Sequence, residues 1–344
     1  MENVNLSREA RRVKALLERY AYGKTPHAPK HLSISKTVSD RSFAAGKAEL
    51  IDVTLTVELE GGACYDMAVR CALPHGQEKC PAFIHIHDDL TMPSRHQPTE
   101  ELCDGGFAVV TVGVNWITAE INKRKRGLAR ALHGSGRKLD APGAIAISAW
   151  CAMRAVDYLH TLNRIDTAHI TVVGHGIYAA SALLCGAYDE RVAFVISNSA
   201  GPSGAALGEK VRGELFELVR ANDFLFCKRF AKLIYRGEKL PVGGDALLSL
   251  IAPRAVLLDN AADDVSDSVA CELCSALLAS KHYEALGIPG IMPPVSAPDA
   301  LISQNGELSF TDGRLAYRRR AGTPYLSRED WRTYMNFVLR GEDK

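Results

Sequence analysis

The hydrophobic and polar positions of this chain change period along its length, and each period predicts a different element. Over residues 8–20 the apolar side chains fall on one helical stripe, with Ser7 as the N-cap. Over residues 31–72 they alternate, as in strands with one buried face. The Gly61-Gly62 pair lies inside this stretch and predicts the turn of an antiparallel hairpin.

Beyond residue 72 the pattern changes to short, wholly apolar runs separated by helical stretches. Runs without alternation are buried on both faces, which is typical of a parallel sheet covered by helices. The main helix between them is expected at about residues 144–162. The apolar strands are predicted at residues 82–87, 108–112, 170–173, 194–196 and 255–258.

This alternation of strands and helices favours one domain over residues 31–344, preceded by an N-terminal helix and lead-in over residues 1–30. Residues 208–248 interrupt the alternation with amphipathic helical sequence. We interpret that segment as a helical cap inserted over the site.

The composition of the chain indicates which partners and which cellular compartment to expect. The 344 residues are 47% hydrophobic and 24% charged, with a formal net charge of +1, so neither nucleic acid nor an anionic membrane is expected as the main partner. We expect no membrane span and no signal peptide, because no apolar run is long enough. The 9 cysteines are odd in number and scattered, which favours reduced thiols and a cytoplasmic protein.

Residues 170–178 read Ile-Thr-Val-Val-Gly-His-Gly-Ile-Tyr, a strand, a tight turn and the start of a helix. In α/β-hydrolases this turn reads G-x-S-x-G and carries the nucleophilic serine. Gly176 occupies the serine position, and His175 before it is interpreted as a packed residue of the turn. We therefore predict an α/β-hydrolase fold, a three-layer sandwich whose mostly parallel central sheet has helices on both faces and an antiparallel N-terminal hairpin.

A serine hydrolase also needs a histidine as general base and an acid that orients it. No histidine follows His282, so the loop before the C-terminal helix offers no base. Asp264 and Asp267 follow the 255–258 strand, where an orienting acid often lies. Both also precede a helix, so capping that helix is an equally good role for them.

The segment His85-Ile86-His87-Asp88-Asp89 ends a strand where hydrolases place oxyanion-binding glycines. Its carboxylates would oppose a developing anion. The same string fits an H-x-H-x-D metal pattern, which makes His85, His87 and Asp89 weak candidate ligands, although Leu90 stands where the next histidine is usual. No cofactor is expected.

Several strings along the chain resemble the glucuronoyl esterase family of carbohydrate esterases and its acetyl-xylan-esterase-like bacterial relatives. The resemblance covers roughly residues 80–340. It rests on residues 152–159 (AMRAVDYL), 164–166 (RID), 173–175 (VGH), 186–191 (GAYDER), 195–198 (VISN), 204–207 (GAAL), 250–254 (LIAPR), 292–295 (MPPV) and 330–331 (DW).

The resemblance implies an α/β-hydrolase fold and cleavage of glucuronate esters by serine, histidine and a carboxylate. It aligns the serine with Gly176, the arginine beside it with Ile177, and the histidine with Pro324. Glu214 matches a glutamate of the family, and Asp267 a carboxylate.

We therefore expect a non-catalytic binding or interaction module of this family, a pseudoenzyme. Its ligand would be a carbohydrate or a uronate-like small molecule, and an oligomer is possible. The binding residues would be His87, Asp88, His175, Ile177 and Glu214. The alternative is an active carboxylic-ester hydrolase with a rebuilt site, which would use metal-bound water or a relocated serine such as Ser181 or Ser199.

Overall fold

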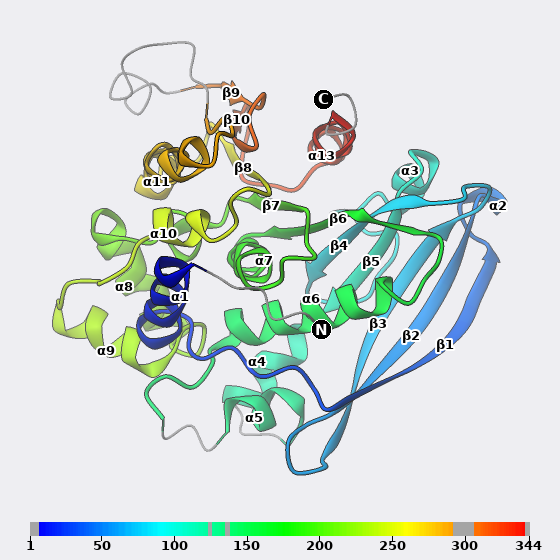
Figure 1. The fold of residues 1–344 in the computed structure, drawn as a ribbon, viewed down its shortest axis with the longest axis horizontal. Helices are drawn as coiled ribbons and strands as arrows, with labels where there is room; N and C mark the ends of the chain where they lie inside the picture. The colour runs from blue at the N-terminus through cyan, green and yellow to red at the C-terminus, as the bar shows by residue number, and fades with distance from the viewer. Residues whose placement is uncertain (1–6, 123–125, 135–137, 292–305, 341–344) are drawn as a thin grey trace.

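The computed structural model describes residues 7–122, 126–134, 138–291 and 306–340. In these residues one sheet of ten strands runs through the molecule in the order β1-β2-β3-β5-β4-β6-β7-β8-β10-β9 (Figure 1). The strands are β1 (His31–Ser42), β2 (Ala48–Glu58), β3 (Cys64–Pro74), β4 (Cys80–His87), β5 (Ala108–Gly113), β6 (Ile165–His175), β7 (Phe194–Asn198), β8 (Ala255–Ala261), β9 (Leu308–Phe310) and β10 (Leu315–Arg320).

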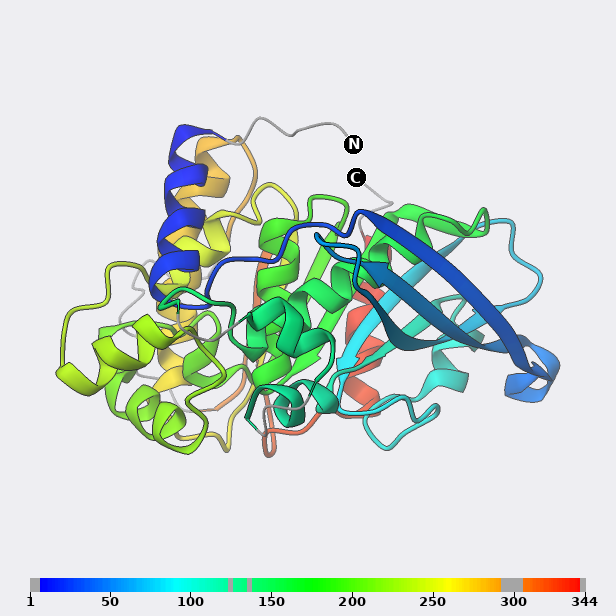
Figure 2. The same ribbon diagram turned by 90° about the horizontal axis from the view of Figure 1, so that it is seen from below.

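Helices cover both faces of the sheet (Figures 1 and 2). The helices are α1 (Arg8–Tyr20), α2 (Phe43–Gly46), α3 (Thr99–Asp104), α4 (Asn115–Asn122), α5 (Leu128–His133), α6 (Ala144–Leu159), α7 (Ile177–Tyr188), α8 (Arg212–Ala221), α9 (Lys228–Arg236), α10 (Gly244–Ser249), α11 (Asp267–Ala285) and α13 (Arg328–Leu339). None of the described helices is long and apolar enough to cross a membrane.

The sheet joins two kinds of pairing, as the two hydrophobic periods predict. Strands β1, β2 and β3 pair antiparallel, and the predicted Gly61-Gly62 turn connects β2 to β3. Strands β5, β4, β6, β7, β8 and β10 form the parallel part. The predicted mostly parallel α/β-hydrolase sheet with an antiparallel N-terminal hairpin is confirmed.

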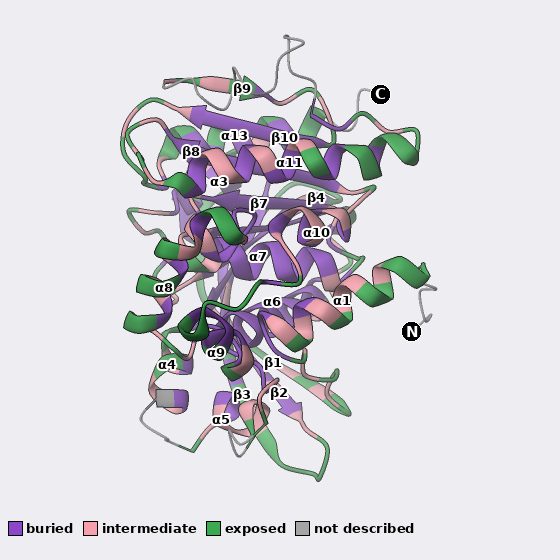
Figure 3. Ribbon diagram, turned by 90° about the vertical axis from the view of Figure 1, so that its left-hand side faces the viewer, coloured by how far each residue is buried: buried purple, intermediate pink, exposed green. Residues whose placement is uncertain are grey.

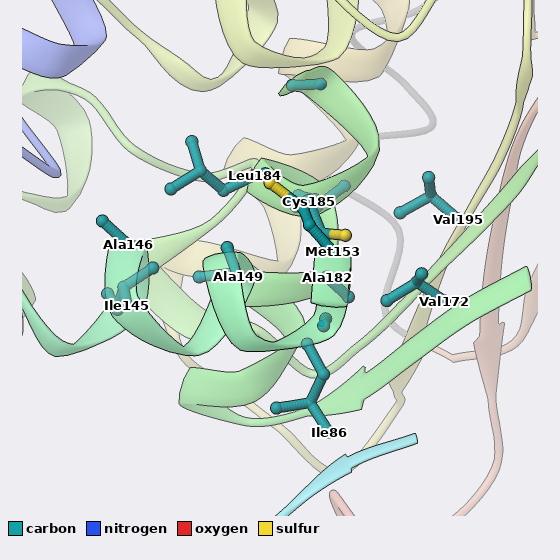
Figure 4. Close-up of a cluster of buried hydrophobic side chains, with 14 of the residues drawn as sticks. Ile86, Ile145, Ala146, Ala149, Met153, Val172, Ala182, Leu184, Cys185 and Val195 are labelled. Carbon is teal, nitrogen blue, oxygen red and sulfur yellow. The ribbon is translucent and has the colours of Figure 1, made fainter. Parts of the chain in front are cut away.

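The core lies in two layers, one on each face of the parallel strands. On one face α6 and α7 pack against the sheet, and Figure 4 shows Met153 and Ala182 facing Ile86, Val172 and Val195 of the strands. On the other face α3 and α13 cover a smaller cluster that includes Phe83 and Trp331. Figure 3 shows the central strands β7 and β8 buried, whereas β9 and the surrounding helices carry exposed residues.

The sequence patterns missed the last part of the sheet. Strand β10 carries Arg318, Arg319 and Arg320, and no strand was predicted there, yet Arg318 and Arg319 are buried. Burial of Arg318 is tolerated because Asp259 and Asp330, both 0% exposed, pair with it. Helices α8 and α9 fall inside residues 208–248 and α10 begins there, and the interpretation of that segment as a cap stays a prediction.

The turn from β6 into α7 has the backbone that a nucleophile elbow requires. Gly176 is the N-cap of α7 with φ 60° and ψ −129°, a conformation that side chains disfavour. Gly174 is needed for a different reason, because a Cβ there would lie 2.1 Å from the carbonyl oxygen of Tyr178. At Gly176 a Cβ would meet nothing within 4 Å. Space for a side chain remains, and only the backbone strain opposes one.

We expect Gly176→Ala to lower the free energy of unfolding by about 1–3 kcal/mol, the usual cost of a strained backbone conformation. Gly213→Ala in α8 is the matched control, since its Cβ also meets nothing within 4 Å and its φ is not positive. The control should be stabilised by about 0.5–1 kcal/mol. Urea denaturation measures both, and equal effects would contradict the strained turn.

Glu272 of α11 is a buried carboxyl group that accepts a hydrogen bond from Asn260 Nδ2 at 2.9 Å. Burial raises the pKa of Glu272 to about 8. A raised carboxyl pKa means that the folded state holds its proton more tightly than the unfolded state does. Its contribution to stability is therefore full below about pH 4.5 and is lost as the pH rises through about 8.

The free energy of unfolding of the wild-type protein should fall between pH 5 and pH 9 as Glu272 ionises. In Glu272→Gln this fall should be smaller, because the amide stays neutral and still accepts the Asn260 hydrogen bond. Denaturant titrations across this range measure the effect. Glu284→Gln, on the exposed side of the same helix, is the control and should keep the wild-type dependence on pH. If the free energy of unfolding of Glu272→Gln falls with pH as steeply as that of the wild type, the raised pKa does not belong to Glu272.

Candidate functional site

The elbow lies at the carboxyl ends of the parallel strands, the edge where α/β folds bind ligands. Its turn is held by a hydrogen bond from the Gly176 N–H to the carbonyl of Asn198 at 2.9 Å. Ile177, 36% exposed, begins α7. Tyr178 takes the last position of the G-x-S-x-G pattern, and its hydroxyl donates to Asp88 Oδ1. The elbow thus keeps its shape while its nucleophile position carries no side chain.

The predicted base position, Pro324, lies in the loop between β10 and α13. That loop is folded around the Arg320 guanidinium, which donates to the carbonyls of Ala321 at 2.9 Å, Thr323 at 3.2 Å and Tyr325. Arg320 Nε also donates to Asp330 Oδ1 at 2.7 Å. The partly buried Arg320 side chain therefore organises the loop that would present a catalytic imidazole in a complete triad.

Histidines gather beside the elbow from separate parts of the chain. His85 and His87 lie on β4 with ring centroids 5.2 Å apart, and His96 lies 5.7 Å from His87 and 6.4 Å from His175. We call His85, His87, His96 and His175 the imidazole cluster. His96 also packs 5.1 Å from the ring of Tyr325, next to Pro324. Sequence reasoning did not single out His96, because only the fold brings it to the base loop.

A row of polar side chains crosses the ends of four adjacent strands. In the sheet register His175 pairs with Asn198, Asn198 with Asp259, and Asp259 with Arg318. We call these residues the polar row. Side chains at one register position of parallel strands share a face, here the face covered by α13. Tyr334 of α13 closes the row by donating its hydroxyl to Asp259 Oδ2 at 2.6 Å.

The polar row is connected by hydrogen bonds. His175 Nδ1 lies 2.6 Å from Asn198 Oδ1. Asn198 Nδ2 donates to Asp259 Oδ2 at 3.1 Å and to the Tyr334 hydroxyl at 2.8 Å. Arg318 Nε forms an ion pair with Asp259 Oδ1 at 3.2 Å. The carboxylate linked to His175 is therefore Asp259, which the sequence reading passed over inside its strand.

Burial sets the charges of these groups. It lowers the pKa of His175, against the opposing effect of the Asn198 hydrogen bond. It also lowers the pKa of His96, and that of His85 well below the usual range. For Asp259 burial outweighs Arg318 and raises the pKa to about 6. At neutral pH these imidazoles are neutral and Asp259 is ionised.

The candidate acids and the candidate cap glutamate have other partners. Asp264 Oδ1 accepts from the Ser266 N–H at 3.0 Å, and Asp267 is the first residue of α11. Glu214 accepts the hydroxyl hydrogen bond of Ser268. Both aspartates stand near the start of α11, but its N-cap is Ser266 and no side chain caps the helix, so the capping role is not observed. None of these carboxylates is bonded to the imidazole cluster in the described ranges.

The metal and relocated-serine alternatives find no support in the geometry. In the part of the chain that the structure describes, no group of three or more His, Cys, Asp or Glu side chains is placed to hold a metal ion. Asp89 Oδ1 accepts from the Thr91 N–H at 2.9 Å and lies 3.8 Å from His87 Nδ1. Ser181 is 1% exposed and its hydroxyl has no partner among the described residues, and the Ser199 N–H donates to the carbonyl of Asp259 at 2.8 Å.

A cavity of about 530 Å³ opens beside the elbow, and Asp88 is part of its wall. Tyr65 and Trp116 give it aromatic surface, and Asp89 and Asn115 give it polar groups. Trp116 Nε1 donates to the carbonyl of Gly113 at 2.8 Å, which fixes the indole at the end of β5. Aromatic faces beside hydrogen-bonding side chains suit a ligand with both apolar and hydroxyl-bearing surfaces.

The sequence of this chain is similar to those of known carbohydrate esterases. A carbohydrate esterase, MZ0003, from an unknown prokaryotic organism is 29% identical over 241 residues, covering 68% of this chain and 53% of the relative. A 4-O-methyl-glucuronoyl methylesterase from Hypocrea jecorina is 24% identical over 290 residues, covering 79% and 56%. The chain thus spans about half the length of these curated relatives.

Solved structures share the fold. A glucuronoyl esterase from Solibacter usitatus superposes with a TM-score of 0.83 at 24% identity, covering 97% of this chain and 92% of that one. A mutant glucuronoyl esterase from Sporotrichum thermophile, in complex with methyl 4-O-methyl-β-D-glucopyranuronate, gives 0.65 at 18% identity, covering 96% and 82%. The family model described as glucuronyl esterase, fungi, matches residues 56–287. The resemblance seen in the sequence is confirmed, and the chain belongs to the glucuronyl esterase family.

Proposed function

We propose that this chain is a carbohydrate-binding member of the family that does not carry out the acyl transfer of a serine esterase. The observation that carries the proposal is Gly176 at the nucleophile position of an intact elbow. Acyl transfer needs an oxygen or sulfur nucleophile within reach of a base. Among the described residues, neither of the candidate serines is hydrogen-bonded to a histidine.

The base loop supports the same proposal independently. Pro324 carries no donor or acceptor on its side chain, and Arg320 occupies the interior of the loop. Loss of the triad typically costs a factor of about 10⁶ in turnover, while binding contacts remain. The chain would therefore keep the recognition part of the family's chemistry without its covalent step.

The proposed ligand is a carbohydrate that carries a uronate group. One related structure holds a methyl glucuronate derivative. In this chain the 530 Å³ cavity beside the elbow offers Tyr65 and Trp116 as stacking surfaces for a sugar ring. In our proposal the path between that cavity and the elbow is lined by four of the predicted binding residues, His87, Asp88, His175 and Ile177.

We further propose a cytoplasmic location. The cysteines Cys64, Cys71, Cys80, Cys103, Cys151, Cys185, Cys227, Cys271 and Cys274 are all free, and most are buried. Unpaired thiols are typical of reducing compartments. Light scattering would decide the oligomeric state, which the sequence left open.

The binding proposal predicts that methyl β-D-glucuronoside binds the wild-type protein and that Tyr65→Ala weakens it about tenfold, equivalent to about 1.4 kcal/mol. Isothermal titration calorimetry measures both. Tyr235→Ala, which removes a 51% exposed tyrosine of α9, is the control and should bind as the wild type does. Binding that is absent, or equally weak in both variants, contradicts the proposal.

The same proposal predicts hydrolysis of the methyl ester of glucuronic acid at no more than about 10⁻⁶ of the rate of a relative with a complete triad. It also predicts no burst of released methanol, since no acyl-enzyme forms. Rapid-quench measurements of methanol against protein concentration test this. A burst equal to the protein concentration would refute the loss of acyl transfer.

A further inference from the structure

We propose that His175 is a general base that activates water against an ester carbonyl held at the elbow, and that Asn198 is its positioning residue. This goes beyond the proposed function, which requires only that the site binds a carbohydrate. A site that forms no acyl-enzyme can still promote direct attack by water, because the nucleophile then comes from the solvent. The polar row supplies the parts that such a base needs.

The sheet register fixes where His175 lies. It ends β6 immediately before Gly176, opposite Asn198 at the end of β7. Asn198 is in turn opposite Asp259 of β8, and both are at most 1% exposed. The imidazole is thus anchored to buried residues of the central strands, next to Gly176 at the nucleophile position. A strand end places a side chain more reproducibly than a surface loop does.

The hydrogen bonds of the row fix which ring nitrogen carries the proton. Ionised Asp259 only accepts, so the contacts of Asn198 Nδ2 with Asp259 and Tyr334 identify it as the amide nitrogen. The Tyr334 hydroxyl donates its own hydrogen bond to Asp259, so its oxygen accepts from Asn198 Nδ2. Asn198 Oδ1 therefore accepts, and the donor facing it is the His175 Nδ1–H. This leaves the lone pair on Nε2, as a general base requires, and asparagine orients the histidine of cysteine-protease triads in the same way.

The charge of His175 suits this role. Burial lowers its pKa, so the imidazole is neutral at pH 7 and able to accept a proton. The charged and titratable groups that face it are Asp330 on α13, Arg320 at the end of β10, His87 of β4 and the stacked ring of His96. Asp330 favours the protonated ring, whereas Arg320 and His87 oppose it.

The other ring nitrogen is available. His175 is only partly buried, and no hydrogen bond occupies its Nε2 in the described ranges. The ring of His96 lies parallel to it with centroids 6.4 Å apart and an interplanar angle of 18°. The imidazole is thus held on one side and open on the other, a geometry that lets a water molecule approach Nε2.

The reaction balances without a further reactant. His175 Nε2 takes one proton from water as the water oxygen bonds to the carbonyl carbon, and the carbonyl electron pair moves to its oxygen. When this intermediate collapses, the bond between carbon and the alcohol oxygen breaks, and the proton on Nε2 passes to the leaving alcohol. The products are the acid and the alcohol. The N–H groups of Ile177 and Tyr178 begin α7, where helix geometry leaves the first N–H groups without a partner inside the helix.

The test uses p-nitrophenyl acetate with the full chain. Wild-type protein should accelerate hydrolysis about 10²–10⁴-fold over buffer, the usual contribution of a general base. His175→Gln should fall to the buffer rate. His282→Gln, which removes an exposed histidine of α11, is the matched control and should keep the full rate. Equal rates in wild type and His175→Gln would overturn the proposal.

Two readouts separate a base from a nucleophilic imidazole and from a structural role. The rate should fall in D₂O, because a proton moves in the transition state, and it should level off at a pH below the ordinary histidine range. Absence of a solvent isotope effect would contradict water activation. In Asn198→Ala the acid side of the pH–rate profile should shift along the pH axis. If neither the profile nor the rate changes, Asn198 does not position His175.

Imidazole ¹⁵N NMR of the wild-type protein keeps the proposal testable should Asn198→Ala fail to fold. His175 should show a protonated Nδ1 and an unprotonated Nε2 at pH 7.5, and the opposite tautomer would overturn the assignment. These outcomes are independent of the carbohydrate proposal, since p-nitrophenyl acetate carries no sugar. Failure of glucuronoside binding would refute the proposed function and leave the role of His175 standing.

Discussion

The turn between β6 and α7 is the constraint on which the rest of the site depends. Its backbone at Gly176, φ 60° and ψ −129°, costs free energy for any residue with a side chain. A serine esterase accepts that cost because the turn exposes its nucleophile. In this chain glycine relieves the strain, and the close approach of the helix at Gly174 keeps the turn in place. The shape of the turn has been retained without the nucleophile that it would expose.

The sheet fixes the remainder of the site through its register. Parallel strands bring His175, Asn198, Asp259 and Arg318 into one row because each stands near the end of its own strand. A polar row at a buried strand edge must satisfy its own hydrogen bonds, and Tyr334 of α13 completes it. The same network that stabilises the buried carboxylate also orients an imidazole. A structural requirement and a chemical capability therefore share the same residues.

The local parts of this arrangement could be predicted from the sequence, and the long-range parts could not. The elbow, the mostly parallel sheet and Pro324 in the base loop follow from strings and periods that span few residues. Asn198, Asp259 and His96 do not, because their partners lie far along the chain and register between strands leaves no periodic signal. The burial of Arg318 was not predicted for a related reason, since an arginine is expected at the surface until its buried carboxylate partner is known.

The loss of the nucleophile is the central claim, and covalent labelling tests it most directly. A fluorophosphonate probe reacts with an activated serine and forms a stable adduct, which intact-protein mass spectrometry detects. The account predicts that the protein keeps its unmodified mass after prolonged incubation, since Gly176 offers no hydroxyl and the candidate serines have no base. A single stoichiometric adduct, mapped to one serine of the described core, would contradict it.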